Sequence, residues 1–88
     1  MQDTQSVIIT NRFFKALDEI VAKKEINSVT AFTNLYGIDR RNLYKLKKQP
    51  EIFMIKVSLL SILVKDFSVL ADWLLTGRGD MFVKVKKI

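Results

Sequence analysis

The 88-residue chain contains no cysteine and no histidine, and it has only one proline and three glycines. Without cysteine it forms no disulfide and offers no thiolate to a metal, and without histidine it lacks the most common general base and neutral metal ligand. Small secreted domains are usually stabilised by disulfides or a structural metal, and this chain has no cysteine or histidine to form them. The composition therefore indicates a domain that is stabilised by the packing of apolar side chains.

Long hydrophobic runs are also missing. The first ten residues, MQDTQSVIIT, carry an acid and no basic residue before a short apolar stretch, unlike a secretory signal or a transit peptide. The most apolar window, IFMIKVSLLSILV at residues 52–64, contains Lys56, Ser58 and Ser61, and it is shorter than the ~20 apolar residues of a membrane span. We interpret this window as buried core, and we expect a cytoplasmic protein that has no membrane partner.

What the chain does have is apolar and locally basic. Apolar residues make up 49% of it, which suits one small packed domain and is too much for a disordered tail. Residues 40–48 (RRNLYKLKK) hold five of the 15 cations and no acid, and residues 83–88 (VKVKKI) hold three, which leaves seven cations against nine acids elsewhere. A basic patch on a slightly acidic body is typical of a polyanion-binding surface. Charge alone leaves a solvated helix face equally open.

The spacing of the apolar residues predicts an all-α domain of four or five helices, with no central sheet. Helices are expected at about 12–24, 29–36, 40–48, from 58 onward, and 71–76. The residues expected to cap their N-termini are Thr10 or Asn11, Asn27 or Ser28, Asp39, and Ser58. Gly37 and Gly77 can close helices in the left-handed conformation, and Pro50 stops the third helix. The alternating tail 83–88 is left open as an edge strand or a disordered segment.

The segment 40–48 has two opposite faces if it is helical. At about 100° per residue, Leu43 and Leu46 lie within about 60° of each other and form an apolar face. The opposite face, about 100° to 200° from Leu43, carries cations and one tyrosine. Those residues are Arg41, Tyr44, Lys45 and Lys48, whereas Arg40 and Lys47 lie nearer the seam and suit phosphates. Only three residues, including Gly37, separate this helix from the one before it, as a helix-turn-helix unit requires.

Three stretches carry a resemblance to a known family: NRFFKALDEIV, SVTAFTNLYGIDRRNLYKL and FSVLADWLLTGRGDMF. Over about residues 12–82 the chain resembles lambda-repressor-like helix-turn-helix domains, in particular the phage-type and mobile-element repressors of Bacteroides-group bacteria. The most specific part is WLLTGRGDM after a short helix. The resemblance implies a compact lambda-repressor-like bundle of four or five helices, and a DNA-binding function.

The resemblance also implies roles for individual residues. The recognition helix would be 40–48, with base-reading candidates Arg40, Arg41, Tyr44 and Lys45, and with Lys48 toward the DNA backbone. Gly37 matches the turn glycine of the family. The matching core positions are Phe32, Tyr36, Ile38, Leu43 and Leu46.

Two positions depart from the family pattern. Thr33 stands where the family usually has a small alanine, and Val29 stands where a glutamine often touches phosphate. Because Val29 donates no side-chain hydrogen bond, we expect that phosphate contact from backbone N–H groups near Ser28 and from Thr30.

Other classes of function find less support. Asp18 and Glu19 point about 100° apart on a helix, and Ser61 with Lys65, one turn apart, lacks a nearby oxyanion site. We expect no enzyme, no cofactor and no metal site, and no small-molecule ligand is evident. The alternative is a protein-interaction module, anti-repressor or antitoxin-like, that has the same fold without base readout.

The expected layout is an N-terminal arm at 1–9, a DNA-binding domain at 10–82 and a basic tail at 83–88. The expected function is sequence-specific binding of a double-stranded DNA operator by a phage-type transcriptional repressor. Because operator binding usually takes two modules on adjacent half-sites, a homodimer is expected. Two alternatives stay open: the chain dimerises through its fifth helix and tail, around Trp73, Met81 and Phe82, or it is the N-terminal part of a longer protein.

Overall fold

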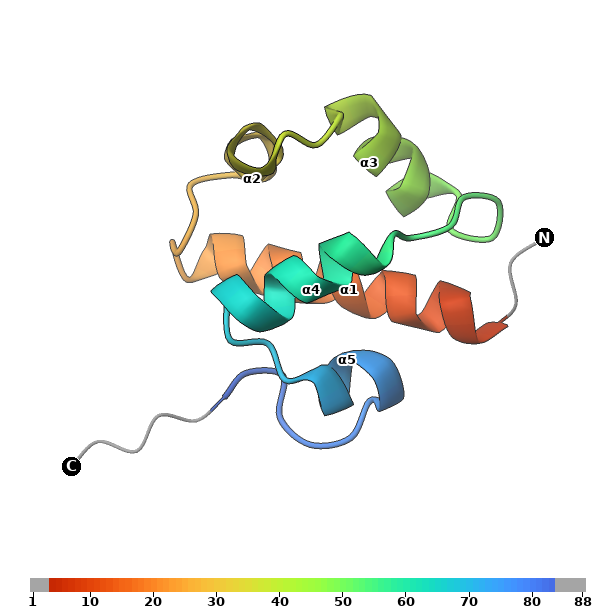
Figure 1. The fold of residues 1–88 in the computed structure, drawn as a ribbon, viewed down its shortest axis with the longest axis vertical. Coiled ribbons are helices and arrows are strands. Elements are labelled where there is room, and N and C mark those ends of the chain that lie inside the picture. Colours follow the sequence, from red (N-terminus) through yellow and green to blue (C-terminus); the bar gives the residue numbers. More distant parts are fainter. Residues whose placement is uncertain (1–3, 84–88) are drawn as a thin grey trace.

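The computed structural model describes residues 4–83, and within this range the chain forms five helices and no named strand. The helices are α1 (Thr4–Ala22), α2 (Val29–Tyr36), α3 (Arg40–Lys48), α4 (Val57–Asp66) and α5 (Ala71–Thr76). In Figure 1, α1 runs across the molecule with α4 lying over it, α2 and α3 on one side, and α5 on the other. The predicted all-α globule is confirmed. Among residues 4–83, no helix is long and apolar enough to cross a membrane.

Helix α1 is the centre of the core, because it contacts each of the other four helices. Its side chains Phe13, Leu17 and Ile20 are fully buried. The ring of Phe13 lies 6.4 Å from that of Phe32 on α2, and Phe32 lies 6.2 Å from Phe67 after α4. Edge-on and tilted aromatic pairs of this kind stabilise a core beyond the area they bury. An aromatic chain thus joins three of the helices.

The first helix begins earlier than predicted. It starts at Thr4, so residues 4–9 of the expected arm belong to α1, whereas residues 1–3 lie outside the described range. Thr10 was expected to cap the helix, but it is buried inside it and its hydroxyl donates to the carbonyl of Ser6 at 2.8 Å. A threonine hydroxyl that donates to the carbonyl four residues earlier is compatible with a helix interior. Thr10 therefore does not cap the start of the helix.

The apolar window at 52–64 is only partly core. Leu59 and Leu63 are buried as expected, but Ile52, Met54 and Val57 are 57%, 70% and 78% exposed. The interpretation of the whole window as buried is therefore wrong for residues 52–57, of which only Ile55 is half-buried; they form the loop between α3 and α4 and the first residue of α4. Ser58 is also not the cap: α4 starts one residue earlier, after Lys56, and has no side-chain cap.

The C-terminal part of the described chain packs back onto the body. Val69 and Phe82 form an isolated antiparallel bridge, flanked by hydrogen bonds from Leu70 N to Met81 O and from Val83 N to Ser68 O, both 2.9 Å long. The ammonium of Lys23 lies 3.7 Å above the Phe82 ring. Of the predicted tail at 83–88, only Val83 lies within the described residues.

Helix α5 ends as predicted at Gly77, which has φ +80°. Its position against α1 depends on Arg12, whose Nη1 donates to the carbonyl of Leu74 at 3.4 Å. A cation at the C-terminal end of a helix also interacts favourably with the helix dipole. A side chain at Gly77 would approach Arg12 Nη2 to 2.7 Å, so this glycine allows a close approach as well as a turn.

Candidate nucleic-acid interface

The turn between α2 and α3 is built from local signals. Gly37 has φ +65° and its N–H donates to the carbonyl of Thr33, which closes α2. No atom lies within 4 Å of a Cβ placed at Gly37, so a side chain would meet no steric clash there. Glycine is favoured at this position because of its positive φ alone. The Asp39 carboxylate accepts from the N–H groups of Arg41 at 2.8 Å and Asn42 at 3.3 Å. The predicted limits of α2 and α3 are confirmed.

Helix α3 divides into a buried stripe and an exposed remainder. Leu43 and Leu46 are 3% and 5% exposed and pack against the core, as the helical wheel predicted. Tyr44 is 61% exposed. All five cations of the helix are also exposed: Arg40, Arg41, Lys45, Lys47 and Lys48.

The four predicted base-reading residues lie together. Arg40, Arg41, Tyr44 and Lys45 line one shallow depression on the outer side of α3. Lys48 joins them, because its ammonium lies 5.6 Å from the centre of the Tyr44 ring, within the range of a cation–π contact. We call these five residues the basic face.

Lys47 points elsewhere. Its ammonium lies 5.9 Å above the ring of Phe14 on α1, so it leans from α3 toward the body of the protein. This agrees with its expected place near the seam between the two faces of the helix.

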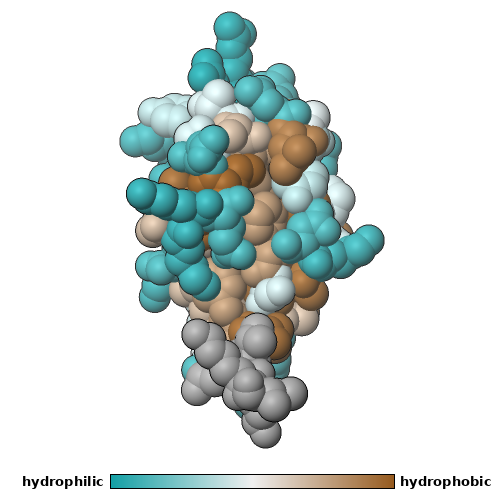
Figure 2. All heavy atoms as spheres, turned by 90° about the vertical axis from the view of Figure 1, so that its left-hand side faces the viewer, coloured by the Kyte–Doolittle hydropathy of each residue, from teal (hydrophilic) through white to brown (hydrophobic). Residues whose placement is uncertain are grey.

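The cations of the basic face have no acidic partner among residues 4–83. Among residues 4–83, none of the cations of α3 forms an ion pair. An unpaired cation keeps its full attraction for an external anion, whereas a paired one must first lose its partner. Figure 2 shows the side of the molecule on which α2 lies: hydrophilic side chains lie at the α2 and α3 end and along both flanks, with hydrophobic surface exposed between them.

The two candidates on α2 have different surroundings from the basic face. The Ser28 hydroxyl oxygen accepts from Ala31 N at 3.0 Å and so serves as the N-cap of α2. Thr30 is exposed in the first turn, where backbone N–H groups have no acceptor within the helix. No hydrogen bond among the described residues connects Ser28 or Thr30 to α3. Thr33 is accommodated in the core, because its hydroxyl donates to the Thr30 carbonyl at 2.7 Å.

A hydrogen bond that sequence reasoning missed holds α2 in place. Tyr36, the last residue of α2, donates its hydroxyl to the Asp66 carboxylate at the end of α4, at 2.8 Å. Burial, this hydrogen bond and the negative charge of Asp66 together raise the pKa of Tyr36 to about 12. The phenol is therefore neutral at physiological pH and acts as a donor. Thirty residues separate the partners, so no local pattern signals the contact.

A groove beside α3 was also missed. A cavity of about 600 Å³ lies between the α2–α3 turn, α3, the following loop and the first half of α4. Asn42 and Lys45 reach it from α3, and Phe53, Met54 and Lys56 from the loop. Lys45 therefore lines both the groove and the basic face.

The described residues offer little to a metal ion. Within residues 4–83, no three acidic side chains lie close enough together to hold one.

Comparisons with models of known protein families, with curated proteins and with solved structures find no match to this chain. The chemistry of the interface is therefore inferred from its own residues.

Proposed function

We propose that this chain binds double-stranded DNA sequence-specifically through a helix-turn-helix formed by α2 and α3, as a transcriptional regulator of the phage-repressor type in the lambda-repressor-like class. The observation that carries the proposal is the basic face: an exposed set of cations and one aromatic ring, free of ion pairs, on a helix that follows a three-residue turn. An α-helix with its side chains is about 10–12 Å across, and the major groove is about 12 Å wide, so a helix such as α3 fits the groove.

The positions of the side chains suggest separate roles. Arg41, Tyr44 and Lys45 lie on the outer side of α3, where base edges would be, and arginine commonly makes a bidentate contact with guanine. Arg40 borders the same depression at the start of the helix, Lys47 leans toward the body and Lys48 lies at the end of the helix, so these three suit phosphate contacts, and Arg40 is also within reach of base edges. The first turn of α2, with Ser28 and Thr30, would add phosphate contacts through its backbone N–H groups.

Specific binding by so small a module calls for two copies. The expected dimer contacts Trp73, Met81 and Phe82 are half-buried and packed against the core of their own chain. Leu75 and Val83 nearby are each 48% exposed. We therefore place the dimer contact at the end of α5 and at Val83, with Trp73, Met81 and Phe82 behind it.

The exposed apolar residues favour a second candidate function. Ile52 and Met54 in the loop after α3 and Val57 at the start of α4 are exposed hydrophobic residues, and surfaces of this kind often bind other proteins. A protein-interaction module would use this loop and have no need of duplex DNA.

The test is binding of a fluorescently labelled random-sequence duplex, followed by anisotropy at 50 mM and 200 mM salt. If five cations each neutralise one phosphate, affinity falls about 500-fold between these conditions. Lys45→Ala should weaken binding, whereas Lys65→Ala, which removes an exposed lysine from the end of α4, should not. Absence of binding at 50 mM by a folded protein would refute the proposal and favour the interaction module. Selection of sites from the random pool then reveals sequence preference.

A further inference from the structure

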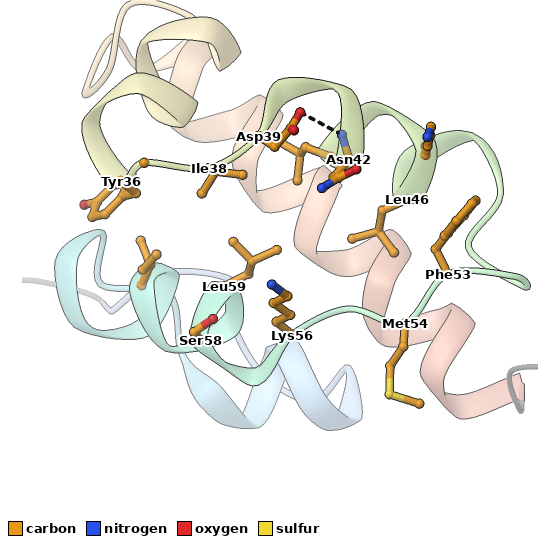
Figure 3. Close-up of a pocket in the computed structure, with 14 residues that line it drawn as sticks. Tyr36, Ile38, Asp39, Asn42, Leu46, Phe53, Met54, Lys56, Ser58 and Leu59 are labelled. Atoms are coloured by element: carbon orange, nitrogen blue, oxygen red, sulfur yellow. Dashed lines mark hydrogen bonds between the residues drawn. The ribbon is translucent and has the colours of Figure 1, made fainter.

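The groove beside α3 has the volume and the apolar lining of a small-molecule site. Its volume of about 600 Å³ lies within the ~300–1,000 Å³ that is usual for such sites. Leu46 of α3 and Leu59 of α4 point into it from opposite sides (Figure 3), and both side chains are otherwise buried. Phe53, 36% exposed, borders it at the loop. An apolar body placed here would displace water from hydrophobic side chains on several sides.

The charged groups of the groove favour an anion. Asp39 is its single acid, and that carboxylate is already engaged in capping α3. Two lysines, Lys45 and Lys56, also line it, and neither forms an ion pair among residues 4–83. Figure 3 shows the Lys56 side chain directing its amine into the space between α3 and α4. The groove thus combines a hydrophobic floor with two unpaired ammonium groups.

We propose that this groove binds a small amphiphilic carboxylate, whose apolar body lies on Leu46, Leu59 and Phe53 and whose anionic group lies between Lys45 and Lys56. Sequence reasoning identified no such site, because its walls come from the α2–α3 turn, α3, the following loop and α4. Lys45 also belongs to the basic face, so a ligand that neutralises it weakens the attraction of α3 for phosphate. This second consequence rests on the proposed DNA binding, but the ligand site itself does not.

The site is tested with 4-phenylbutyrate as the probe, by following backbone amide signals of the full chain in two-dimensional NMR. Two controls separate the parts of the ligand: 4-phenylbutanamide lacks the charge, and acetate lacks the apolar body. We expect shifts concentrated at Asn42, Lys45, Phe53 and Ser58, and clearly weaker binding of both controls. Shifts scattered over the surface, or equal binding of the amide, would overturn the proposal.

Matched variants sharpen the test. Lys56→Met should weaken 4-phenylbutyrate binding about twofold to fivefold, the range of a partly exposed ion pair. Lys65→Met, at the other end of α4 and outside the groove, should leave it unchanged. Ser58→Trp should block the groove, and Ser61→Trp, another exposed serine of α4, should not. The NMR spectrum of each variant shows at once whether it is folded. Unchanged binding by folded Ser58→Trp would exclude the groove.

The coupling to DNA has a separate readout. At matched sodium concentration, saturating 4-phenylbutyrate should weaken binding of the random duplex about twofold to fivefold, and it should have no effect on DNA binding by Ser58→Trp. If no duplex binds, the proposed function fails while the NMR titration still decides the site. If the duplex binds and the ligand binds without competition, the site stands and the coupling through Lys45 is wrong.

Discussion

Helices α1 and α3 use the same helical period for different purposes. Helix α1 touches all four other helices and buries six of its 19 residues. Helix α3 buries only Leu43 and Leu46, and its other seven residues face solvent. The comparison shows that one helix can supply the largest share of the core while another is held by a narrow apolar stripe. That division leaves the outer side of α3 free to bind without disturbing the fold.

The largest expected effect separates the two helices by stability. Phe13→Ala in α1 removes a fully buried ring and should lower the free energy of unfolding by about 3–5 kcal/mol, because it leaves a cavity among the aromatic side chains. Leu43→Ala in α3 should cost about 2–5 kcal/mol, and Tyr44→Ala, at an exposed position, less than about 0.5 kcal/mol. Urea denaturation measures all three. A large loss in Tyr44→Ala would mean that the outer side of α3 is structural.

The next effect concerns DNA and leaves stability unchanged. Arg41→Ala should cost about 1–3 kcal/mol of binding on a selected site and relax the preference at one base pair, because it removes the proposed base contact. Lys48→Ala should weaken all duplexes alike and lower the slope of affinity against salt by about one. Anisotropy titrations on matched and mismatched duplexes distinguish the two. Equal effects of both variants on every sequence would remove the claim of base readout.

A smaller effect compares the glycines that close α2 and α5. Gly37→Ala should lower the free energy of unfolding by about 1 kcal/mol, because alanine is strained at positive φ. Gly77→Ala should cost about 1–2 kcal/mol, since its methyl group must also displace Arg12 and its hydrogen bond to Leu74. Denaturation of both variants under one condition gives the difference. A larger loss at Gly37 would show that the Arg12 contact contributes nothing.

The smallest effect is a loss of stability at alkaline pH. The pKa of Tyr36 is about 12 in the folded protein and about 10 in an unfolded chain. Its contribution is therefore complete below pH 10 and is lost as the pH rises from about 10 to 12, because the unfolded chain releases the proton first. Thermal denaturation at pH 8 and pH 11 should show a larger decline for the wild type than for Tyr36→Phe. Parallel declines would contradict the role given to the bond with Asp66.

The elements predicted best are those specified by neighbouring residues. Ser28, Gly37 and Asp39 act within three residues of the helix ends that they define, so α2, the turn and α3 were predictable. The start of α1 was missed because Thr10 is a good cap in isolation, while its hydroxyl is equally well satisfied inside a helix. The apolar loop at 52–57 was assigned to the core because hydrophobicity alone does not tell whether a neighbour will cover it.

The candidate site divides in the same way. The basic face was predictable, because its members occupy one side of a single helix and their direction follows from the helical period. The groove was not, because it combines the α2–α3 turn, α3, a loop and α4.

The amino-acid sequence by itself therefore determined an all-α domain, the limits of α2, α3 and α5, and the opposition of leucine and cation on α3. Only the tertiary structure decided which apolar residues stay exposed, that Tyr36 bonds to Asp66, and that Lys45 borders both the basic face and a groove. The physical reason is the range of the interactions. Caps and helical faces depend on residues within a few positions, whereas burial, long-range hydrogen bonds and cavities depend on segments that meet only after folding.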